Sequence, residues 1–236
     1  MIVTPIVRKL ALCMASLVFA LATSSAMADT IAVIGTGNVG GALGPEFAAQ
    51  GHDIVYGSRE PERADVQELV ARTPGNAAVA LPTEAVIGAD IVVLAVPGGV
   101  AEAAVGSLGD LSGKIIIDPT NRVAPGEDGY FDHTAETSNG LMIQELVPTA
   151  HVVKAFNTLN YATMIDPDGP VTIPLAGNDS DAKETVAELV AGMGLEPVDV
   201  GPIRSSEVLE GMLTIWLNAR QAGTPYDYHF RQAPAP

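Results

Sequence analysis

The chain has 236 residues, a net charge of −16 at pH 7 and one cysteine, Cys13. Such an acidic chain repels nucleic acid and anionic membranes, and a single cysteine excludes a disulfide framework. The length and the 47% content of hydrophobic residues fit one domain, or one domain with a small appendage.

Residues 1–28 have the three parts of a secretory signal peptide. Arg8 and Lys9 precede an apolar run at Leu10–Ala22, which is too short to span a membrane, and Ala26-Met27-Ala28 resembles a cleavage site. We therefore expect cleavage after Ala28 and a periplasmic or secreted protein with no membrane span. Cleavage would leave 208 residues with a net charge near −18 and no cysteine. The alternative is a cytoplasmic protein whose translation starts at Met27.

Apolar, β-branched runs alternate with helical patterns along the rest of the chain, which is typical of a parallel sheet with crossover helices. The nearly continuous Val, Ile and Leu content of these runs predicts strands buried on both faces. The sequence therefore predicts an α/β fold of the Rossmann type, with a doubly wound, mostly parallel sheet. The expected strands are Thr30–Ile34, Asp53–Tyr56, Ala77–Leu81, Asp90–Val96, Lys114–Asp118, His151–Phe156, Val171–Ala176 and Glu196–Val200.

The first crossover helix is indicated by Val39, Leu43 and Phe47, which recur at every fourth residue and so share one face. Pro45 lies inside this helix, where a missing N–H should kink or locally open it. A second helix is expected around Val66–Val70.

The segment after the fifth expected strand shows the least regular pattern. Residues 119–140 predict a long irregular loop around a turn at Pro125–Gly129. Helices are expected near Leu141–Val147 and over Ser205–Ala222, and residues 223–236 form a Pro-rich tail.

A Gly-x-Gly-x-x-Gly turn follows the first strand directly, at Gly35, Gly37 and Gly40. Gly35 allows a tight turn, Gly37 lets the backbone approach a pyrophosphate, and Gly40 lets the helix lie close to the strand. The helix would offer its free N–H groups to the phosphates. Because the turn leaves a strand and opens a helix, it predicts dinucleotide binding.

The end of the second strand indicates which dinucleotide is bound. An NAD site usually has an acid here to bind the ribose hydroxyls, but this chain has Ser58 and Arg59 and no acid directly after the strand. A hydroxyl and a guanidinium suit a 2′-phosphate, so NADP is favoured. In the alternative interpretation, Ser58 caps a helix beginning near Pro61 and Arg59 is simply solvated.

At this point the chain resembles a known family. The segments Ile34–Leu43, Gly51–Arg59, Leu94–Pro97 and Val153–Leu159 are similar to those of NADPH-dependent deazaflavin reductases, also called coenzyme F-420-dependent NADP oxidoreductases. Related domains reduce flavins in metalloreductases. The resemblance covers residues 29–222 and implies hydride transfer between NADP and a deazaflavin. It also implies that Thr36, Asn38, Ser58 and Arg59 hold NADP.

Open α/β sheets bind ligands at the carboxyl ends of their strands, so further cofactor contacts are expected there. Asn121 and Asn157 have amides that could bind a carboxamide or ribose, although capping of loops is an alternative role. The cofactor-binding residues expected in full are Gly35, Thr36, Gly37, Asn38, Val39, Gly40, Ser58, Arg59, Val96, Pro97, Asn121 and Asn157.

No catalytic side chain and no metal site is expected. His52, His133, His151 and His229 lack the spacing of metal ligands, and no nucleophile, base and acid occur in a recognisable order. Hydride transfer between two stacked heterocycles needs mainly positioning and exclusion of water. The irregular 119–140 segment and the helix around Met212–Trp216 are candidate walls for the acceptor.

The chain is thus expected to comprise a signal peptide (1–28), an NADP-binding Rossmann domain (29–156), a small C-terminal β/α part (157–222) and a tail (223–236). Its expected function is that of an NADPH-dependent oxidoreductase acting on a deazaflavin, flavin or similar small-molecule acceptor. Export would separate it from cytoplasmic NADP, which keeps open a non-catalytic module that binds another phosphorylated ligand or a partner protein. A homodimer is also left open.

Overall fold

The structure is a computed structural model that describes residues 28–133 and 137–224. The predicted signal peptide, apart from Ala28, lies outside the described residues, as do residues 225–236 of the predicted tail. Within the described ranges, none of the helices has the length and apolar character needed to cross a membrane.

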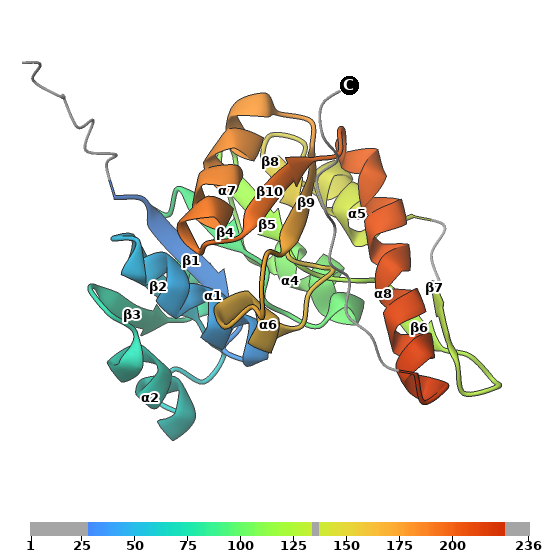
Figure 1. The fold of residues 1–236 in the computed structure, drawn as a ribbon. Helices are drawn as coiled ribbons and strands as arrows, with labels where there is room; N and C mark the ends of the chain where they lie inside the picture. The colour runs from blue at the N-terminus through green and yellow to red at the C-terminus, as the bar shows by residue number, and fades with distance from the viewer. Residues whose placement is uncertain (1–27, 134–136, 225–236) are drawn as a thin grey trace, which may run out of the picture.

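An eight-stranded sheet forms the centre of the molecule, in the order β10-β9-β8-β5-β4-β1-β2-β3 (Figure 1). Neighbouring strands are parallel except for β8 and β9, which run antiparallel. The predicted doubly wound, mostly parallel fold is therefore confirmed. The strands are β1 Thr30–Ile34, β2 Asp53–Gly57, β3 Ala77–Ala80, β4 Ile91–Val93, β5 Ile115–Asp118, β8 His151–Lys154, β9 Thr172–Gly177 and β10 Glu196–Asp199.

Helices cover both faces of the sheet, which explains why its strands are apolar on both sides. Alternate residues of β1 point to opposite faces, with Ile31 and Val33 in one core cluster and Ala32 and Ile34 in the other. The helices are α1 Asn38–Ala49, α2 Ala64–Arg72, α3 Pro82–Ala85, α4 Ala101–Ser107, α5 Asn139–Leu146, α6 Tyr161–Ile165, α7 Ser180–Gly192 and α8 Ser206–Gln221, with 3₁₀ turns at Gly98–Val100 and Ile203–Ser205.

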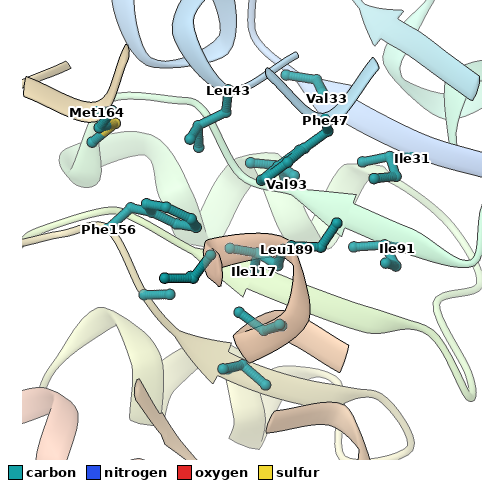
Figure 2. Packing of buried hydrophobic residues seen from close by; sticks show 14 of the residues in the cluster. Ile31, Val33, Leu43, Phe47, Ile91, Val93, Ile117, Phe156, Met164 and Leu189 are labelled. Atoms are coloured by element: carbon teal, nitrogen blue, oxygen red, sulfur yellow. The ribbon is translucent and has the colours of Figure 1, made fainter. Parts of the chain in front are cut away.

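The larger core cluster joins α1, α6 and α7 to one face of the sheet (Figure 2). Leu43 and Phe47 of α1 are fully buried, as their four-residue spacing predicted. The Phe47 ring meets the Phe156 ring edge to face, with centroids 6.2 Å apart. This packing fixes the helix that follows the glycine turn.

Helix α1 continues through Pro45. A proline has no N–H, so the carbonyl four residues earlier, at Gly41, loses its helical donor. The Arg72 side chain at the end of α2 supplies a replacement, with Nη2 2.9 Å from the Gly41 carbonyl oxygen. A contact between two helices therefore compensates for the proline.

The sequence-based expectation of an irregular 119–140 segment is wrong in part. Residues Val123–Pro125 (β6) and Phe131–His133 (β7) pair as an antiparallel hairpin around the predicted turn. The hairpin stands beside α8 (Figure 1), where the Asn218 amide binds both the N–H and the carbonyl of Phe131. Strands of three residues are too short to give a periodic signal, and α8 stabilises this pair.

Two strands end more than one residue earlier than predicted, at the edge of the sheet where ligands are expected. Strand β4 ends at Val93 rather than Val96, and β8 ends at Lys154 rather than Phe156. Phe156 has a φ of +63°, which no strand residue adopts. The chain therefore turns away from the ladder at both places.

Candidate functional site

The glycine turn after β1 places its three glycines in three different environments. A Cβ at Gly35 would lie 2.2 Å from the Ala95 carbonyl oxygen, and Gly35 also has a φ of +109°. A Cβ at Gly40 would lie 2.0 Å from the Gly35 carbonyl oxygen, whereas a Cβ at Gly37 would meet nothing within 4 Å. The fold needs the first and the last glycine, but the middle one borders open space.

That open space is part of a cleft of about 650 Å³ at the carboxyl ends of β1, β2 and β4. The strand order reverses between β1 and β4, which is where open α/β sheets bind ligands. Residues that line the cleft are Ile34, Gly35, Thr36, Gly37, Gly57, Ser58, Arg59, Glu60, Arg63, Pro82, Ala95, Val96, Pro97, Val100, Ala103, Ala104, Ser107 and Leu108.

Seven of the twelve expected cofactor residues line this cleft, namely Gly35, Thr36, Gly37, Ser58, Arg59, Val96 and Pro97. The other five, Asn38, Val39, Gly40, Asn121 and Asn157, do not. Asn38 and Val39 begin α1 and Gly40 is buried under the turn. The cleft therefore supports direct contact with a cofactor at the seven lining positions and not at these five.

The β2 end of the cleft is polar. Ser58 is buried, and Arg59 is exposed with no hydrogen bond or ion pair to any residue in the described ranges. The Ser58 Oγ accepts a hydrogen bond from the backbone N of Glu60, while α2 begins only at Ala64 after Arg63. The alternative that Ser58 caps a helix near Pro61 is therefore wrong.

Two charged residues at this end were missed by sequence reasoning. Arg63 lines the cleft, and its Nε and Nη2 donate to Asp65 at 2.6 and 2.9 Å. This hydrogen bond raises the pKa of Arg63 and lowers that of Asp65. Glu60 also lines the cleft, which corrects the expectation that no acid is near. Since Arg63 is paired with Asp65, the guanidinium that remains for an anionic ligand is that of Arg59.

The β4 end of the cleft is apolar, formed by Ala95, Val96, Pro97, Val100 and the adjacent face of α4. We call this region the apolar end. Apolar walls of this kind exclude water and accommodate a flat heterocycle.

Asn121 and Asn157 lie together beside this region, although the sequence separates them by 36 residues. The Asn121 Nδ2 donates to the Asn157 carbonyl at 3.1 Å, and the Asn157 Nδ2 donates to the Asn121 Oδ1 at 3.0 Å. Within the described residues, the buried Asn157 Oδ1 has no donor. An unsatisfied buried acceptor of this kind is costly, which fits a ligand donor at this point.

Sequence reasoning also missed a buried group of charges behind the apolar end. Lys154, Asp118 and Glu210 are all fully buried and form ion pairs at 2.9 and 2.6 Å. A lysine in the otherwise apolar run of β8 was the available signal.

The residues at the cleft fit a dinucleotide that carries a 2′-phosphate. Gly37 leaves room for a close backbone approach, Ser58 and Arg59 offer donors at the β2 end, and the apolar end offers a dry surface. These features suit, in that order, a pyrophosphate, a phosphate and a nicotinamide ring.

Comparison with known proteins agrees with this geometry. Residues 30–122 match the family model described as NADP oxidoreductase, coenzyme F420-dependent. A solved structure of a candidate F420-dependent NADP reductase from Arthrobacter sp. FB24 is 30% identical, with a TM-score of 0.77, and the match covers 86% of this chain and 99% of that one. The chain belongs to the family of F420-dependent NADP oxidoreductases.

Two curated relatives extend this result. The F420-dependent NADP reductase of Methanothermobacter marburgensis is 27% identical over 205 residues, covering 80% of this chain and 91% of the relative. The rat metalloreductase STEAP3 is 29% identical over 187 residues, covering 78% of this chain, which spans about a third (36%) of STEAP3. The protein is thus an NADP-dependent oxidoreductase, as its sequence predicted.

Proposed function

We propose that this protein transfers a hydride between NADP(H) and a deazaflavin, a flavin or a similar flat acceptor. The observation that carries the proposal is the cleft itself, in which Arg59, without a partner among the described residues, lies at the β2 end and an apolar surface lies at the β4 end. The nicotinamide ring of the cofactor would lie at the apolar end.

The chain's own residues would bind and orient the cofactor. The turn between Gly35 and Gly40 would hold the pyrophosphate through its free backbone N–H groups, and Ser58 and Arg59 would hold the 2′-phosphate with Arg63 beside them. Val96 and Pro97 would support the nicotinamide, with Asn121 and Asn157 next to it. NADPH supplies the hydride, while the protein supplies proximity and a dry surface.

The role of Arg59 can be tested by replacing it with Ala. We expect NADPH binding to weaken by about 1.5–3 kcal/mol, as for a charged hydrogen bond, because the 2′-phosphate loses its guanidinium. NADH binding should hardly change. Titration of both cofactors measures the effect, and Arg204→Ala, at an exposed arginine outside the cleft, is the matched control. Equal losses for both cofactors would refute the role.

The acceptor and the mechanism can be tested together. NADPH deuterated on one face of its nicotinamide should transfer label to a deazaflavin or flavin acceptor from one face only. His133→Ala and His151→Ala should each lower the rate by less than the roughly 100-fold expected of a general acid. Neither histidine lines the cleft. Loss of essentially all activity at either one, with NADPH affinity intact, would make that histidine the catalytic group.

We also propose that the protein is exported and that its signal peptide is cleaved after Ala28. Support comes from the order of charged, apolar and small residues in 1–28. Asp29, the first residue after the predicted cleavage site, is held by the fold, because its backbone N donates to the His52 Nδ1 at 3.2 Å. The carbonyl of Asp29 accepts from Asp53 N at 3.0 Å.

A further inference from the structure

Lys154, at the end of β8, is fully buried between two carboxylates. Its Nζ lies 2.9 Å from the Asp118 Oδ2 of β5 and 2.6 Å from the Glu210 Oε1 of α8. It also donates to the Thr120 carbonyl at 2.5 Å. One ammonium group therefore joins two strands of the sheet to the last helix.

Glu210 extends this network to backbone groups of two other segments. Its Oε2 accepts from the N–H groups of Arg122 at 3.0 Å and Asn139 at 3.1 Å, and its Oε1 accepts from Gly140 at 3.2 Å. These donors offset the negative charge that Lys154 alone cannot balance. One carboxylate thus fixes both the loop after β5 and the start of α5.

Asn139 carries the network to the wall of the cleft. Its Nδ2 donates to the Thr120 Oγ1 at 2.8 Å and to the Gly98 carbonyl at 3.0 Å. Gly98 packs so tightly that a Cβ there would lie 1.8 Å from the Asn121 carbonyl oxygen. Gly98 directly follows Val96 and Pro97, which line the apolar end of the cleft.

Stability alone is a weak reason for such a network. Three buried charges are costly to desolvate, and well-packed apolar side chains of similar volume often stabilise a fold as well or better. Apolar side chains could not, however, hold the backbone of three loops at fixed hydrogen-bond distances. The distinctive contribution of the charges is therefore geometric.

We propose that Lys154 and Glu210 are positioning residues, which hold the 97–98 and 120–122 loops in the geometry that receives the nicotinamide. This inference rests on the proposed function, because it assigns the apolar end to the nicotinamide ring. The network of Lys154, Glu210 and Asn139 reaches only the apolar end of the cleft. Among the described residues, those of the β2 end, which would bind the 2′-phosphate, make no hydrogen bond or ion pair with it.

The experiment compares two ligands, NADPH and 2′,5′-ADP, which lacks the nicotinamide half. Glu210→Gln is the sharpest variant, because its amide keeps the shape but places N–H groups where Oε2 accepts from Arg122 and Asn139. We expect the affinity for 2′,5′-ADP to stay within about twofold, and the advantage of NADPH over 2′,5′-ADP to fall by roughly 10-fold or more. The rate of hydride transfer should fall by about 10- to 100-fold, as for a small misplacement of reacting groups.

Lys154→Met gives a second measurement, and Lys183→Met is the matched control. Lys183 also pairs with a carboxylate, the exposed Asp199 Oδ2 at 2.7 Å, but outside the cleft and outside the buried group. If Lys154→Met does not fold, Glu210→Gln carries the test alone. A thermal unfolding curve verifies that each variant is folded at the assay temperature.

The outcomes separate this inference from the proposed function. Equal weakening of both ligands, or an unchanged ratio of affinities in folded Glu210→Gln, would overturn the positioning role, because a purely structural network does not distinguish the two halves of the cofactor. Failure of the unmodified protein to bind either ligand would overturn the proposed function, and this inference with it.

Discussion

Gly37 differs from its two neighbouring glycines in what surrounds it. Gly35 and Gly40 have backbone atoms where a side chain would begin, but Gly37 has a φ of −79° and open space. A side chain at Gly37 is thus compatible with the fold and incompatible with a closely approaching ligand. Substitutions at these positions separate folding from binding.

We expect Gly37→Ala to weaken NADPH binding on the order of 10-fold or more, because a methyl group would occupy the space of the pyrophosphate. Its free energy of unfolding should change by less than about 1 kcal/mol, the usual cost of replacing Gly by Ala at a helix N-cap. Gly40→Ala should instead lower the free energy of unfolding by about 1–3 kcal/mol through overpacking. Calorimetric titration and denaturant unfolding check both. An unchanged NADPH affinity in Gly37→Ala would contradict this role.

At the scale of elements, α2 contacts α1 at the point where α1 lacks a helical hydrogen bond. Pro45 leaves the Gly41 carbonyl without a helical donor, and Arg72 supplies one from the last turn of α2. The sequence shows the proline but not the arginine that compensates for it, because the two residues are distant along the chain. Arg72 therefore stabilises α1 only because Pro45 is present.

This dependence predicts the result of a double-mutant cycle. Arg72→Ala should cost about 1 kcal/mol in the free energy of unfolding of the unmodified protein, the typical value of a net hydrogen bond. In a Pro45→Ala background the same change should cost less than about 0.5 kcal/mol, because the alanine introduced there donates its own N–H to the Gly41 carbonyl. Urea unfolding of the four proteins gives the coupling energy. A cost of Arg72→Ala that is equal in both backgrounds would show that the two residues act independently.

At the scale of the whole molecule, one continuous sheet carries both the nucleotide half and the C-terminal strands. β9 and β10 extend the sheet from β8, so residues of the expected C-terminal part pack directly on the Rossmann strands. Helix α8 packs beside α5 and the β6–β7 hairpin and brings Glu210 to Lys154 at the end of β8. The C-terminal segment therefore completes the buried group of charges behind the apolar end, while the cleft itself is lined by residues between Ile34 and Leu108.

The signal peptide gives a prediction at the same scale. Since Asp29 and the strand that follows it are tied into the sheet, cleavage after Ala28 should leave a chain that folds fully. N-terminal sequencing of the protein from separated cell fractions should read Asp29-Thr30-Ile31. A cytoplasmic species that starts at Met27 or Ala28 would contradict export.

The sequence by itself determined the architecture and predicted part of the lining of the cleft. β1 was predicted at its observed bounds, and Gly35, Gly37, Ser58 and Arg59 line the cleft. These features are local: a buried strand, a tight turn and a polar strand end each depend on a few adjacent residues. The sequence also indicated the reductase family through motifs of this kind.

Only the tertiary structure decided which side chains meet across long stretches of sequence. Lys154 meets Asp118 and Glu210 across 36 and 56 residues of sequence, and Arg72 meets Gly41 across 31. The β6–β7 hairpin likewise forms against α8, 87 residues away at Asn218. Contacts over such distances leave no periodicity in the sequence, because they depend on the path of the chain through the sheet rather than on local preference.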